Sequence, residues 1–271
     1  MIQDIYPSRF NNSYVPFEIR NDDIILIFDD EGKVLVHEED GMVSLVNEVS
    51  KELAKTYLFS LDEQRFFLAM ESDYAENETE KYMTIRDIRK KAPQKTVFVL
   101  FTAYHLWQWY SVNKFCGRCG ERVEFHASER ALQCQKCGNI IYPRINPAVI
   151  VGVTRGDEIL ITKYRRGYAH SALVAGFTEI GETLEETVER EVMEEAGIKV
   201  KNIRYYKSQP WGMAQDILAG FFCEVDGDSE IKMDENELKY AAWVKRGDIE
   251  LQPDNLSLTN EMMKVFKYDE I

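Results

Sequence analysis

The segment from Gly176 to Ile198 places a glycine-containing loop directly before a short helix that has a signal at each end. Thr183, followed three residues later by Glu186, has the spacing of a capping box that begins a helix. Gly197 supplies the left-handed residue with which helices commonly end. The sequence therefore predicts a helix over residues 183–196. Its apolar residues recur every four positions and form one stripe that faces a core: Leu184, Val188, Val192 and Ala196.

Three glutamates lie beside this stripe, and their crowding indicates a cation site. Glu191 and Glu195 fall at one border of the stripe, and Glu194 lies one step further around the helix. Like charges four residues apart destabilise a helix, and partial burial increases that cost. Mg²⁺ and Mn²⁺ prefer oxygen ligands and commonly bind between carboxylates and substrate phosphates. The alternative is an acidic helix face that is exposed to solvent.

Four cysteines upstream of this helix form two Cys-x2-Cys pairs, and each pair is followed by glycine. They are Cys116, Cys119, Cys134 and Cys137. This spacing is typical of a zinc ribbon, in which four thiolates surround one Zn²⁺ and leave no position for substrate, so the zinc would be structural. Disulfides or a redox-active pair are the alternatives. The fifth cysteine, Cys223, lies in a strand-like run and is predicted to be a core residue.

The composition is that of a globular protein and excludes several classes of function. The 271 residues are 45% hydrophobic, enough for one or two domains with a core. No apolar run approaches the ~20 residues of a membrane span, and no secretory signal is visible, so we expect a cytoplasmic protein without membrane contact. The net charge of −14 argues against a broad basic surface for nucleic acid. A small anion bound through a metal remains compatible with this charge.

Hydrophobic patterning predicts an α/β (α+β) chain in three parts. Residues 1–115 form a mixed N-terminal α/β domain, with strands expected near 24–28, 34–36 and 65–70 and an aromatic-rich helix over 97–112. Residues 116–142 form the ribbon. Residues 143–271 form a mixed sheet with helices packed on it. Its expected strands are 147–154, 158–163, 203–207, 217–225 and 240–244, and a closing helix is expected over 258–266.

The segment that begins at Gly176 matches the pattern G-x5-E-x7-R-E-U-x-E-E-x-G-U, where U is a bulky aliphatic residue, at every fixed position. It thereby resembles the signature of Nudix hydrolases. The resemblance implies an α/β/α sandwich over residues 143–271 that hydrolyses a nucleoside diphosphate linked to another group. It also implies that Arg190 orients the glutamates. Mg²⁺ or Mn²⁺ would be held by Glu191, Glu194, Glu195 and the carbonyl of Ala175.

A zinc ribbon placed before this domain, with Ser208-Gln209-Pro210-Trp211 after the signature helix, resembles the NADH pyrophosphatases. In that family the tetrapeptide usually continues through proline, phenylalanine, proline, any residue and serine. This chain departs from the family at that point and has Gly212-Met213-Ala214-Gln215-Asp216. Loss of the prolines and of one aromatic ring predicts a more flexible pocket wall and weaker discrimination among dinucleotides.

The family pattern implies further residue roles. Phe177 would stack on the nicotinamide or another base, Tyr142 would reach the same ring from the partner subunit of a homodimer, and Glu237 would add a carboxylate to the metal cluster. The remaining residues implied to line the dinucleotide pocket are Glu129, Gln209, Pro210, Trp211 and Asp216. The alternatives are that the aromatic residues belong to a core and that Glu129 and Glu237 are surface charges.

Together these features predict metal-assisted attack of water on the pyrophosphate of NAD(H)-like dinucleotides, with nicotinamide mononucleotide and AMP as products. Glu195, or Glu194, would accept the proton, and Glu195 is favoured because it borders the apolar stripe. One alternative is removal of an NAD cap from RNA. Another is a broader hydrolase of ADP-ribose or dinucleoside polyphosphates. The third is a non-catalytic ligand sensor, which the complete signature disfavours.

Overall fold

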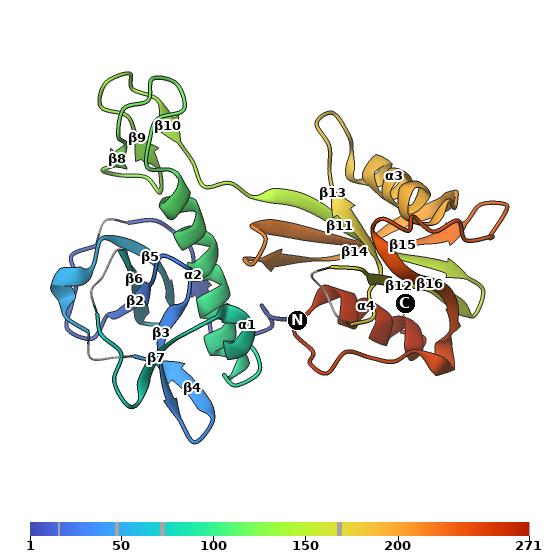
Figure 1. The fold of residues 1–271 in the computed structure, drawn as a ribbon, viewed down its shortest axis with the longest axis horizontal. Helices are drawn as coiled ribbons and strands as arrows, with labels where there is room; N and C mark the ends of the chain where they lie inside the picture. Colours follow the sequence, from blue (N-terminus) through green and yellow to red (C-terminus); the bar gives the residue numbers. More distant parts are fainter. Residues whose placement is uncertain (16, 47–48, 71–73, 167–169, 271) are drawn as a thin grey trace. The chain divides into compact units, whose positions relative to one another are not determined.

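The computed structural model describes residues 1–15, 17–46, 49–70, 74–166 and 170–270, which fall into two compact units (Figure 1). The N-terminal unit comprises Gln3–Arg144 together with Gly212–Gln215. The C-terminal unit comprises Met1–Ile2, Ile145–Trp211 and Asp216–Ile271. Residues 1–2 therefore belong to the C-terminal unit, although the residues that follow them belong to the N-terminal unit. Residues 212–215 belong to the N-terminal unit, although the residues on both sides of them belong to the C-terminal unit.

The N-terminal unit is built on a sheet in the order β1-β5-β6-β2-β3-β4, with β7 paired to β3. Strands β2 and β6 run parallel, and the other pairs are antiparallel. The strands are β1 (Phe10–Asn11), β2 (Ile24–Phe28), β3 (Val34–Glu39), β4 (Met42–Leu45), β5 (Thr56–Leu61), β6 (Gln64–Met70) and β7 (Glu80–Met83). A 3-10 turn, η1, spans Lys51–Leu53.

Two helices, α1 (Ile85–Ile88) and α2 (Gln94–Val112), complete this sheet domain. Helix α2 is the aromatic-rich helix that the sequence predicts, and its two tryptophans pack against protein. Trp109 is 2% exposed, and the ring of Trp107 stacks on Phe28 with 5.4 Å between centroids. The zinc-ribbon segment then forms a small sheet in the order β10-β9-β8. Its strands are β8 (Glu124–Phe125), β9 (Leu132–Gln133) and β10 (Ile140–Ile141).

The C-terminal unit has a mixed sheet in the order β14-β15-β11-β12-β16, with β13 paired to β11. Strands β11 and β15 run parallel, and all other pairs are antiparallel. The strands are β11 (Asn146–Arg155), β12 (Glu158–Tyr164), β13 (Val174–Phe177), β14 (Val200–Trp211), β15 (Asp216–Val225) and β16 (Leu238–Lys245). Helix α3 spans Leu184–Ala196, a 3-10 turn η2 spans Arg246–Asp248, and helix α4 spans Leu258–Lys267.

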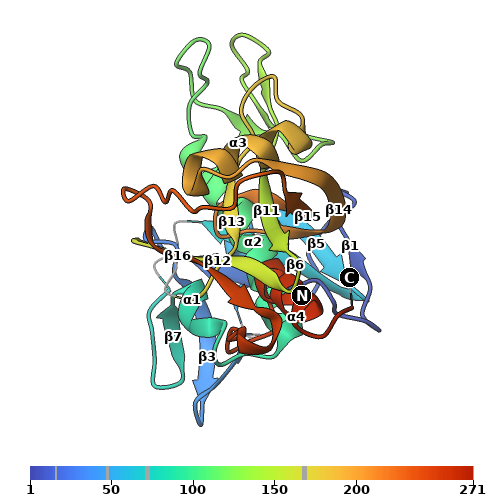
Figure 2. The same cartoon turned by 90° about the vertical axis from the view of Figure 1, so that its right-hand side faces the viewer.

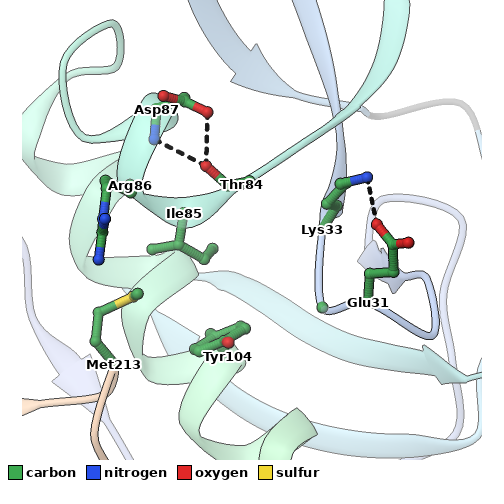
Figure 3. A pocket seen from close by; sticks show the side chains of 9 residues that line it. Glu31, Lys33, Thr84, Ile85, Arg86, Asp87, Tyr104 and Met213 are labelled. Atoms are coloured by element: carbon green, nitrogen blue, oxygen red, sulfur yellow. Dashed lines mark hydrogen bonds and ion pairs between the residues drawn. The ribbon is translucent and has the colours of Figure 1, made fainter. Parts of the chain in front are cut away.

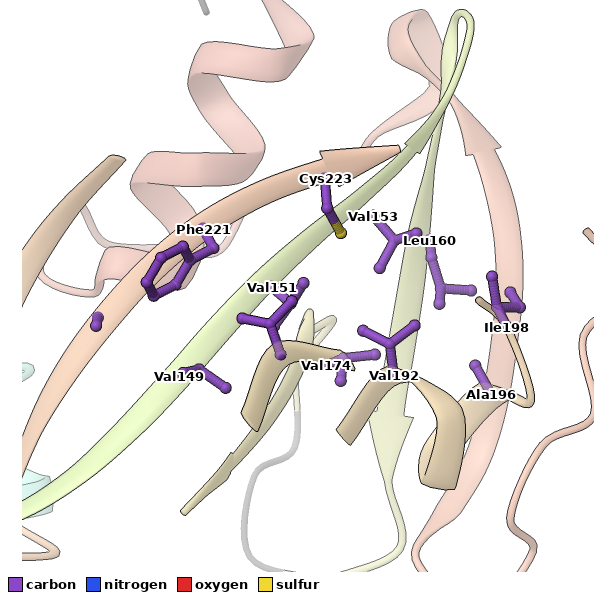
Figure 4. Close-up of a cluster of buried hydrophobic side chains, with 12 residues drawn as sticks. Val149, Val151, Val153, Leu160, Val174, Val192, Ala196, Ile198, Phe221 and Cys223 are labelled. Atoms are coloured by element: carbon purple, nitrogen blue, oxygen red, sulfur yellow. The ribbon is translucent and has the colours of Figure 1, made fainter. Parts of the chain in front are cut away.

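The alternation of side chains along β11 assigns one helix to each face of this sheet. Val149, Val151 and Val153 pack with the apolar stripe of α3 and with Cys223, which is 1% exposed, so its predicted core position is confirmed (Figure 4). Ile150 points to the other face and packs with α4 through Met262 and its neighbours. The two views of the ribbon show α3 and α4 on opposite sides of the sheet (Figure 2). The α/β/α sandwich is therefore confirmed.

The local signals around α3 act as the sequence predicts. Thr183 accepts a hydrogen bond from the Glu186 backbone, while the Glu186 carboxylate accepts one from the Thr183 backbone, which completes the capping box. Gly197 ends the helix with a φ of 69°. Strand β14 is longer than the predicted strand, and the tetrapeptide 208–211 forms its C-terminal end.

Candidate active site

The helix α3 places its three predicted metal-binding glutamates in different degrees of contact with solvent. Glu195 is 1% exposed and Glu191 is 9% exposed, whereas the side chain of Glu194 is 61% exposed. This order follows from the helix geometry, because Glu195 and Glu191 border the buried stripe and Glu194 turns away from it. Two carboxylates are therefore held in a desolvated position beside β13.

Burial raises the pKa of Glu195 to about 8, and the nearby charges of Glu191 and Glu237 push it in the same direction. The pKa of Glu191 is also raised, first by burial and then by Glu194 and Glu237, although Arg190 lowers it. Glu237 precedes β16, and the backbone of the same loop donates to α3, from the Asp234 N–H to the Glu195 carbonyl at 3.0 Å. The structure thus brings Glu237 close enough to act on both buried carboxylates.

Arg190 organises the acidic cluster from one side. Its guanidinium makes a two-point contact with Glu182 at 2.6 and 2.9 Å and also donates to Glu191 at 2.7 Å and Glu194 at 3.1 Å. A further bond at 2.8 Å goes to the carbonyl of Phe177 on β13. This contact with Arg190 lowers the pKa of Glu182 to about 2. Sequence reasoning left Glu182 without a role, although it is the fixed glutamate six positions after Gly176 in the pattern.

Gly176 provides the space into which Glu191 fits. A Cβ at this position would lie 2.0 Å from the carboxylate carbon of Glu191, so any other residue would displace it. The cluster therefore offers carboxylate oxygens, and the space that Gly176 leaves allows Glu191 its present position. Hard divalent cations bind such donor sets. Among the described residues, no three carboxylates come within 4.8 Å of one another, so it is the oxygen donors, and not their present spacing, that fit the metal that the sequence predicts.

Tyr164, the last residue of β12, joins Glu195 to β13. Its hydroxyl lies 2.9 Å from Oε1 of Glu195 and accepts a hydrogen bond from the Ala175 N–H at 3.0 Å. Ala175 is the residue whose carbonyl is predicted to complete the metal shell. No local sequence signal marks Tyr164, because it precedes the signature and reaches the site only through the pairing of strands.

The four ribbon cysteines converge as the sequence predicts. Their ligand atoms all lie within 4.8 Å of one another, with Sγ–Sγ distances of 3.6 Å between Cys116 and Cys137 and 3.5 Å between Cys119 and Cys134. All five cysteines are free of disulfides. Backbone donation from Arg118 and its neighbours lowers the pKa of Cys116 to about 6, which favours the thiolate that zinc binds. The donor set fits a closed, structural zinc site.

The predicted substrate residues of the C-terminal unit differ in accessibility. Phe177 is 51% exposed, Pro210 is exposed and Trp211 is half-buried, so these three present surface to a ligand. Gln209 is fully buried, and its amide bonds the Leu256 carbonyl at 2.8 Å and the Leu258 N–H at 2.7 Å. In this structure its side chain holds the start of α4, and direct contact with substrate would require those bonds to break.

Asp216 and the turn before it show how the departure from the family pattern is accommodated. Asp216 is 5% exposed, and burial raises its pKa to about 6. The preceding turn packs within the N-terminal unit, where Gln108 donates to the carbonyl of Gly212 at 3.0 Å. A Cβ on Gly212 would lie 2.0 Å from the Phe101 carbonyl oxygen, so close packing requires glycine there. Gly212 is therefore in close contact with α2, and the flexibility expected of this segment stays a prediction.

In the N-terminal unit, Glu129 and Tyr142 contact each other, with the Tyr142 hydroxyl donating to Glu129 at 2.7 Å. Tyr142 is 57% exposed, so its ring is open to a ligand. A separate pocket of about 520 Å³ in this unit includes Met213 of the altered segment 212–216 but none of the residues predicted to bind metal or to contact the substrate (Figure 3). Its lining residues are Glu31, Gly32, Lys33, Thr84, Ile85, Arg86, Asp87, Tyr104 and Met213.

Within the described residues, no helix is long and apolar enough to cross a membrane.

Comparison with known proteins places these features in one family. Residues 144–264 match the NUDIX domain model, and residues 113–142 match the model of the NADH pyrophosphatase zinc ribbon domain. A protein named NAD-capped RNA hydrolase NudC from Citrobacter koseri is 46% identical over 151 residues, which cover 55% of this chain and 58% of that protein. A protein of the same name from Mannheimia succiniciproducens is 38% identical over 194 residues, which cover 68% of this chain and 70% of that protein.

A solved structure supports the same fold. The NUDIX hydrolase from Nitrosomonas europaea aligns with a TM-score of 0.51 and 22% identity, over 58% of this chain and 91% of that one. For the Citrobacter protein, and for a Haemophilus influenzae protein of the same name of which 64% is covered, the match spans less than two thirds of the relative's length.

Proposed function

Because the chain belongs to the Nudix hydrolases that carry the NADH pyrophosphatase zinc ribbon, we propose that it hydrolyses the pyrophosphate bond of NAD(H)-like dinucleotides. The products are nicotinamide mononucleotide and AMP. The observation that carries this proposal is the position of Glu195, a buried carboxylate with a raised pKa between Tyr164 and two other acidic residues. Burial and neighbouring negative charge make this carboxylate a stronger base than an ordinary glutamate, which suits it to take a proton from water once it is ionised.

The residues of the acidic cluster have separate roles in metal binding, proton transfer and orientation. The divalent cation, Mg²⁺ or Mn²⁺, would be held by Glu191, Glu194, Glu195, Glu237 and the carbonyl of Ala175. When bound, it would neutralise phosphate charge and make the attacking water more acidic. Glu195 accepts the proton, with Glu194 as the alternative. Arg190 fixes Glu191 and Glu194 by hydrogen bonds and is in turn fixed by Glu182. The cysteine-bound zinc stabilises the ribbon and takes no part in the reaction.

Substrate recognition uses the exposed aromatic residues. Phe177 stacks on the nicotinamide or adenine ring, and Pro210, Trp211 and Asp216 line the remaining pocket, with Gln209 behind them. Glu129 and Tyr142 complete the pocket, and Tyr142 comes from the partner subunit of a homodimer. Light scattering during size-exclusion chromatography tests the dimer, and a monomer with full activity contradicts this assignment of Tyr142. We place the protein in the cytoplasm, where NAD(H) is available.

The decisive experiment is a product analysis with NADH, NAD, ADP-ribose and diadenosine diphosphate in the presence of Mg²⁺ or Mn²⁺. Cleavage of NAD(H) must give AMP and the nicotinamide mononucleotide, whereas release of free nicotinamide would indicate a different bond and overturn the proposal. Glu195→Gln should lower kcat by about 10²-fold or more, because proton transfer and a metal ligand are both lost. Glu189→Gln is the matched control, since Glu189 is an exposed glutamate on the same helix.

Removal of an NAD cap from RNA is a second candidate, and the printed names of the relatives favour it. The same chemistry applies, because the cap contains the same pyrophosphate bond. The net charge of −14 makes strong contact with the RNA backbone unfavourable. A comparison of kcat/KM for NAD-capped RNA and free NADH separates the two functions. A clear preference for the RNA, falling steeply with salt, would assign the cap as substrate. A broader activity on ADP-ribose or dinucleoside polyphosphates would appear in the panel above.

A further inference from the structure

The contacts of Tyr164 point to a residue that organises the metal site without belonging to it. Its hydroxyl lies 2.9 and 3.2 Å from the two carboxylate oxygens of Glu195 and 3.0 Å from the backbone nitrogen of Ala175. A phenol has one proton to donate. The hydroxyl therefore accepts from the Ala175 N–H and donates to the nearer oxygen of Glu195, and it links β13 to α3 from the end of β12.

The pairing of β13 explains why Ala175 needs this partner. Ala175 lies opposite Ile150 in the antiparallel pair with β11, and its N–H bonds Tyr164 rather than β11. In an antiparallel pair, residues alternate between those bonded to the partner strand and those whose N–H and C=O both point away from it. The N–H and the carbonyl of Ala175 thus point to the same outer edge of β13, and there the carbonyl lies 3.4 Å from the Tyr164 hydroxyl.

We propose that Tyr164 is a positioning residue that fixes the Glu195 carboxylate relative to the Ala175 carbonyl, the two predicted metal ligands that it contacts. This inference rests on the metal site of the proposed function. It assigns to Tyr164 no contact with substrate and no exchange of protons. Hydrogen bonds to ligating groups commonly change metal affinity about 10–100-fold, so the effect is measurable.

Without the hydroxyl, the site has a competing arrangement. The Ala175 N–H already lies 3.4 Å from Oε1 of Glu195, so a small movement would let the carboxylate take over this bond. One carboxylate oxygen would then be committed to the backbone, and the remaining oxygen would point differently. Tyr164→Phe retains the ring and its packing and removes only the hydroxyl, so it tests positioning directly.

The same sheet supplies a matched control. Tyr206 on β14 also contacts a glutamate through its hydroxyl, Glu261 on α4 at 3.3 Å, on the opposite face of the sheet. Tyr206→Phe removes the same atom from a tyrosine that is less buried than Tyr164 and is not linked to the cluster on α3. Any general effect of losing a phenol hydroxyl from this domain should appear equally in both variants.

The experiment measures Mn²⁺ dissociation constants by electron paramagnetic resonance in the absence of substrate, with zinc bound. Tyr164→Phe should weaken Mn²⁺ binding by about tenfold or more, whereas Tyr206→Phe should leave it unchanged. In a Glu195→Gln background, Tyr164→Phe should have little further effect, because the residue acts through the lost carboxylate. Steady-state kinetics should show a kcat that recovers in part at high Mn²⁺, with an unchanged KM for NADH.

Equal loss of Mn²⁺ affinity in the Glu195→Gln background, or no loss in the wild-type background, would overturn the proposal. A lower melting temperature without a change in Mn²⁺ affinity would also overturn it, because that result assigns Tyr164 to the fold alone. The binding measurements contain no dinucleotide. If the variants behave as expected while wild type fails to cleave NAD(H), the positioning role stands and the proposed function fails.

Discussion

The chain contains two clusters of predicted metal ligands, the ribbon cysteines and the glutamates of α3, and they are built in opposite ways. The ribbon cysteines form a complete set on a small sheet, with four sulfur atoms within 4.8 Å of one another. The carboxylates on α3 are instead restrained by neighbours that are not ligands, namely Arg190 and Tyr164. A closed set of ligands suits an ion that stabilises a fold. Ligands held by surrounding hydrogen bonds suit an ion that must also admit substrate and water.

The largest effect is expected on the ribbon. Cys134 is fully buried, and Cys134→Ser should abolish stoichiometric zinc binding and unfold the ribbon, since structural zinc contributes roughly 10 kcal/mol or more in small zinc domains. Elemental analysis and limited proteolysis between residues 113 and 142 measure both effects. Cys223→Ala, which removes a core thiol far from the ribbon in sequence, should retain one zinc per chain. Equal zinc content in both variants would show that Cys134 is not needed for zinc binding, and the ribbon cysteines would then not be a complete ligand set.

The second largest effect is expected at Gly176, where the absence of a side chain leaves space for the Glu191 carboxylate. Gly176→Ala should displace the Glu191 carboxylate and weaken Mn²⁺ binding about tenfold or more while the protein stays folded. Calorimetric titration with Mn²⁺ measures the affinity. Gly247→Ala is the control, because a Cβ there meets no atom within 4 Å. Unchanged Mn²⁺ affinity in Gly176→Ala would mean that the position of Glu191 does not matter to the site.

A smaller effect should appear in the pH dependence of stability without added Mg²⁺ or Mn²⁺. The pKa of Glu195 is about 8 in the folded protein against an ordinary 4.5, so the folded state holds this proton where the unfolded chain has released it. The free energy of unfolding should therefore fall as pH rises from about 4.5 to about 8. Urea denaturation across this range should show a steeper fall for wild type than for Glu195→Gln. Identical slopes would show that Glu195 ionises normally.

The smallest effect is expected at Asp216, a buried carboxylate outside both clusters. Its pKa is also raised by burial, and its Oδ1 makes no hydrogen bond within the described part of the chain. Asp216→Ser should change the ratio of kcat/KM among NADH, NAD, ADP-ribose and diadenosine diphosphate a few-fold and leave Mn²⁺ affinity unchanged. A sharp preference for NADH that persists in Asp216→Ser would exclude this position from specificity.

The sequence predicted best where the determinant is local. The caps of α3, its apolar stripe and the cysteine spacing each depend on residues a few positions apart, and the structure confirms them. Strand pairing was predicted only in outline, because register depends on contacts between distant segments. The role of Tyr164 could not be predicted for that reason, since β12 and β13 must first assemble.

Two further residues have contacts that the sequence did not predict. Gln209 belongs to a motif that the family pattern places at the pocket, yet its amide satisfies two backbone groups at the start of α4. Gly212 was interpreted as a source of flexibility, and it allows close approach to the carbonyl of Phe101. In both cases, the residue contacts a segment that is far away in the sequence, and the spacing of nearby residues does not predict such a contact.

The division of the chain into units has a practical consequence for attempts to isolate the hydrolase domain. The chain passes from one unit to the other four times, after Ile2, Arg144, Trp211 and Gln215. A fragment that starts after residue 144 would lose the bond from the Ile2 N–H to the Leu256 carbonyl, and it would leave the turn 212–215 without the helix that packs on it. The two halves are therefore poor candidates for exchange by a single recombination event, and they should be inherited together.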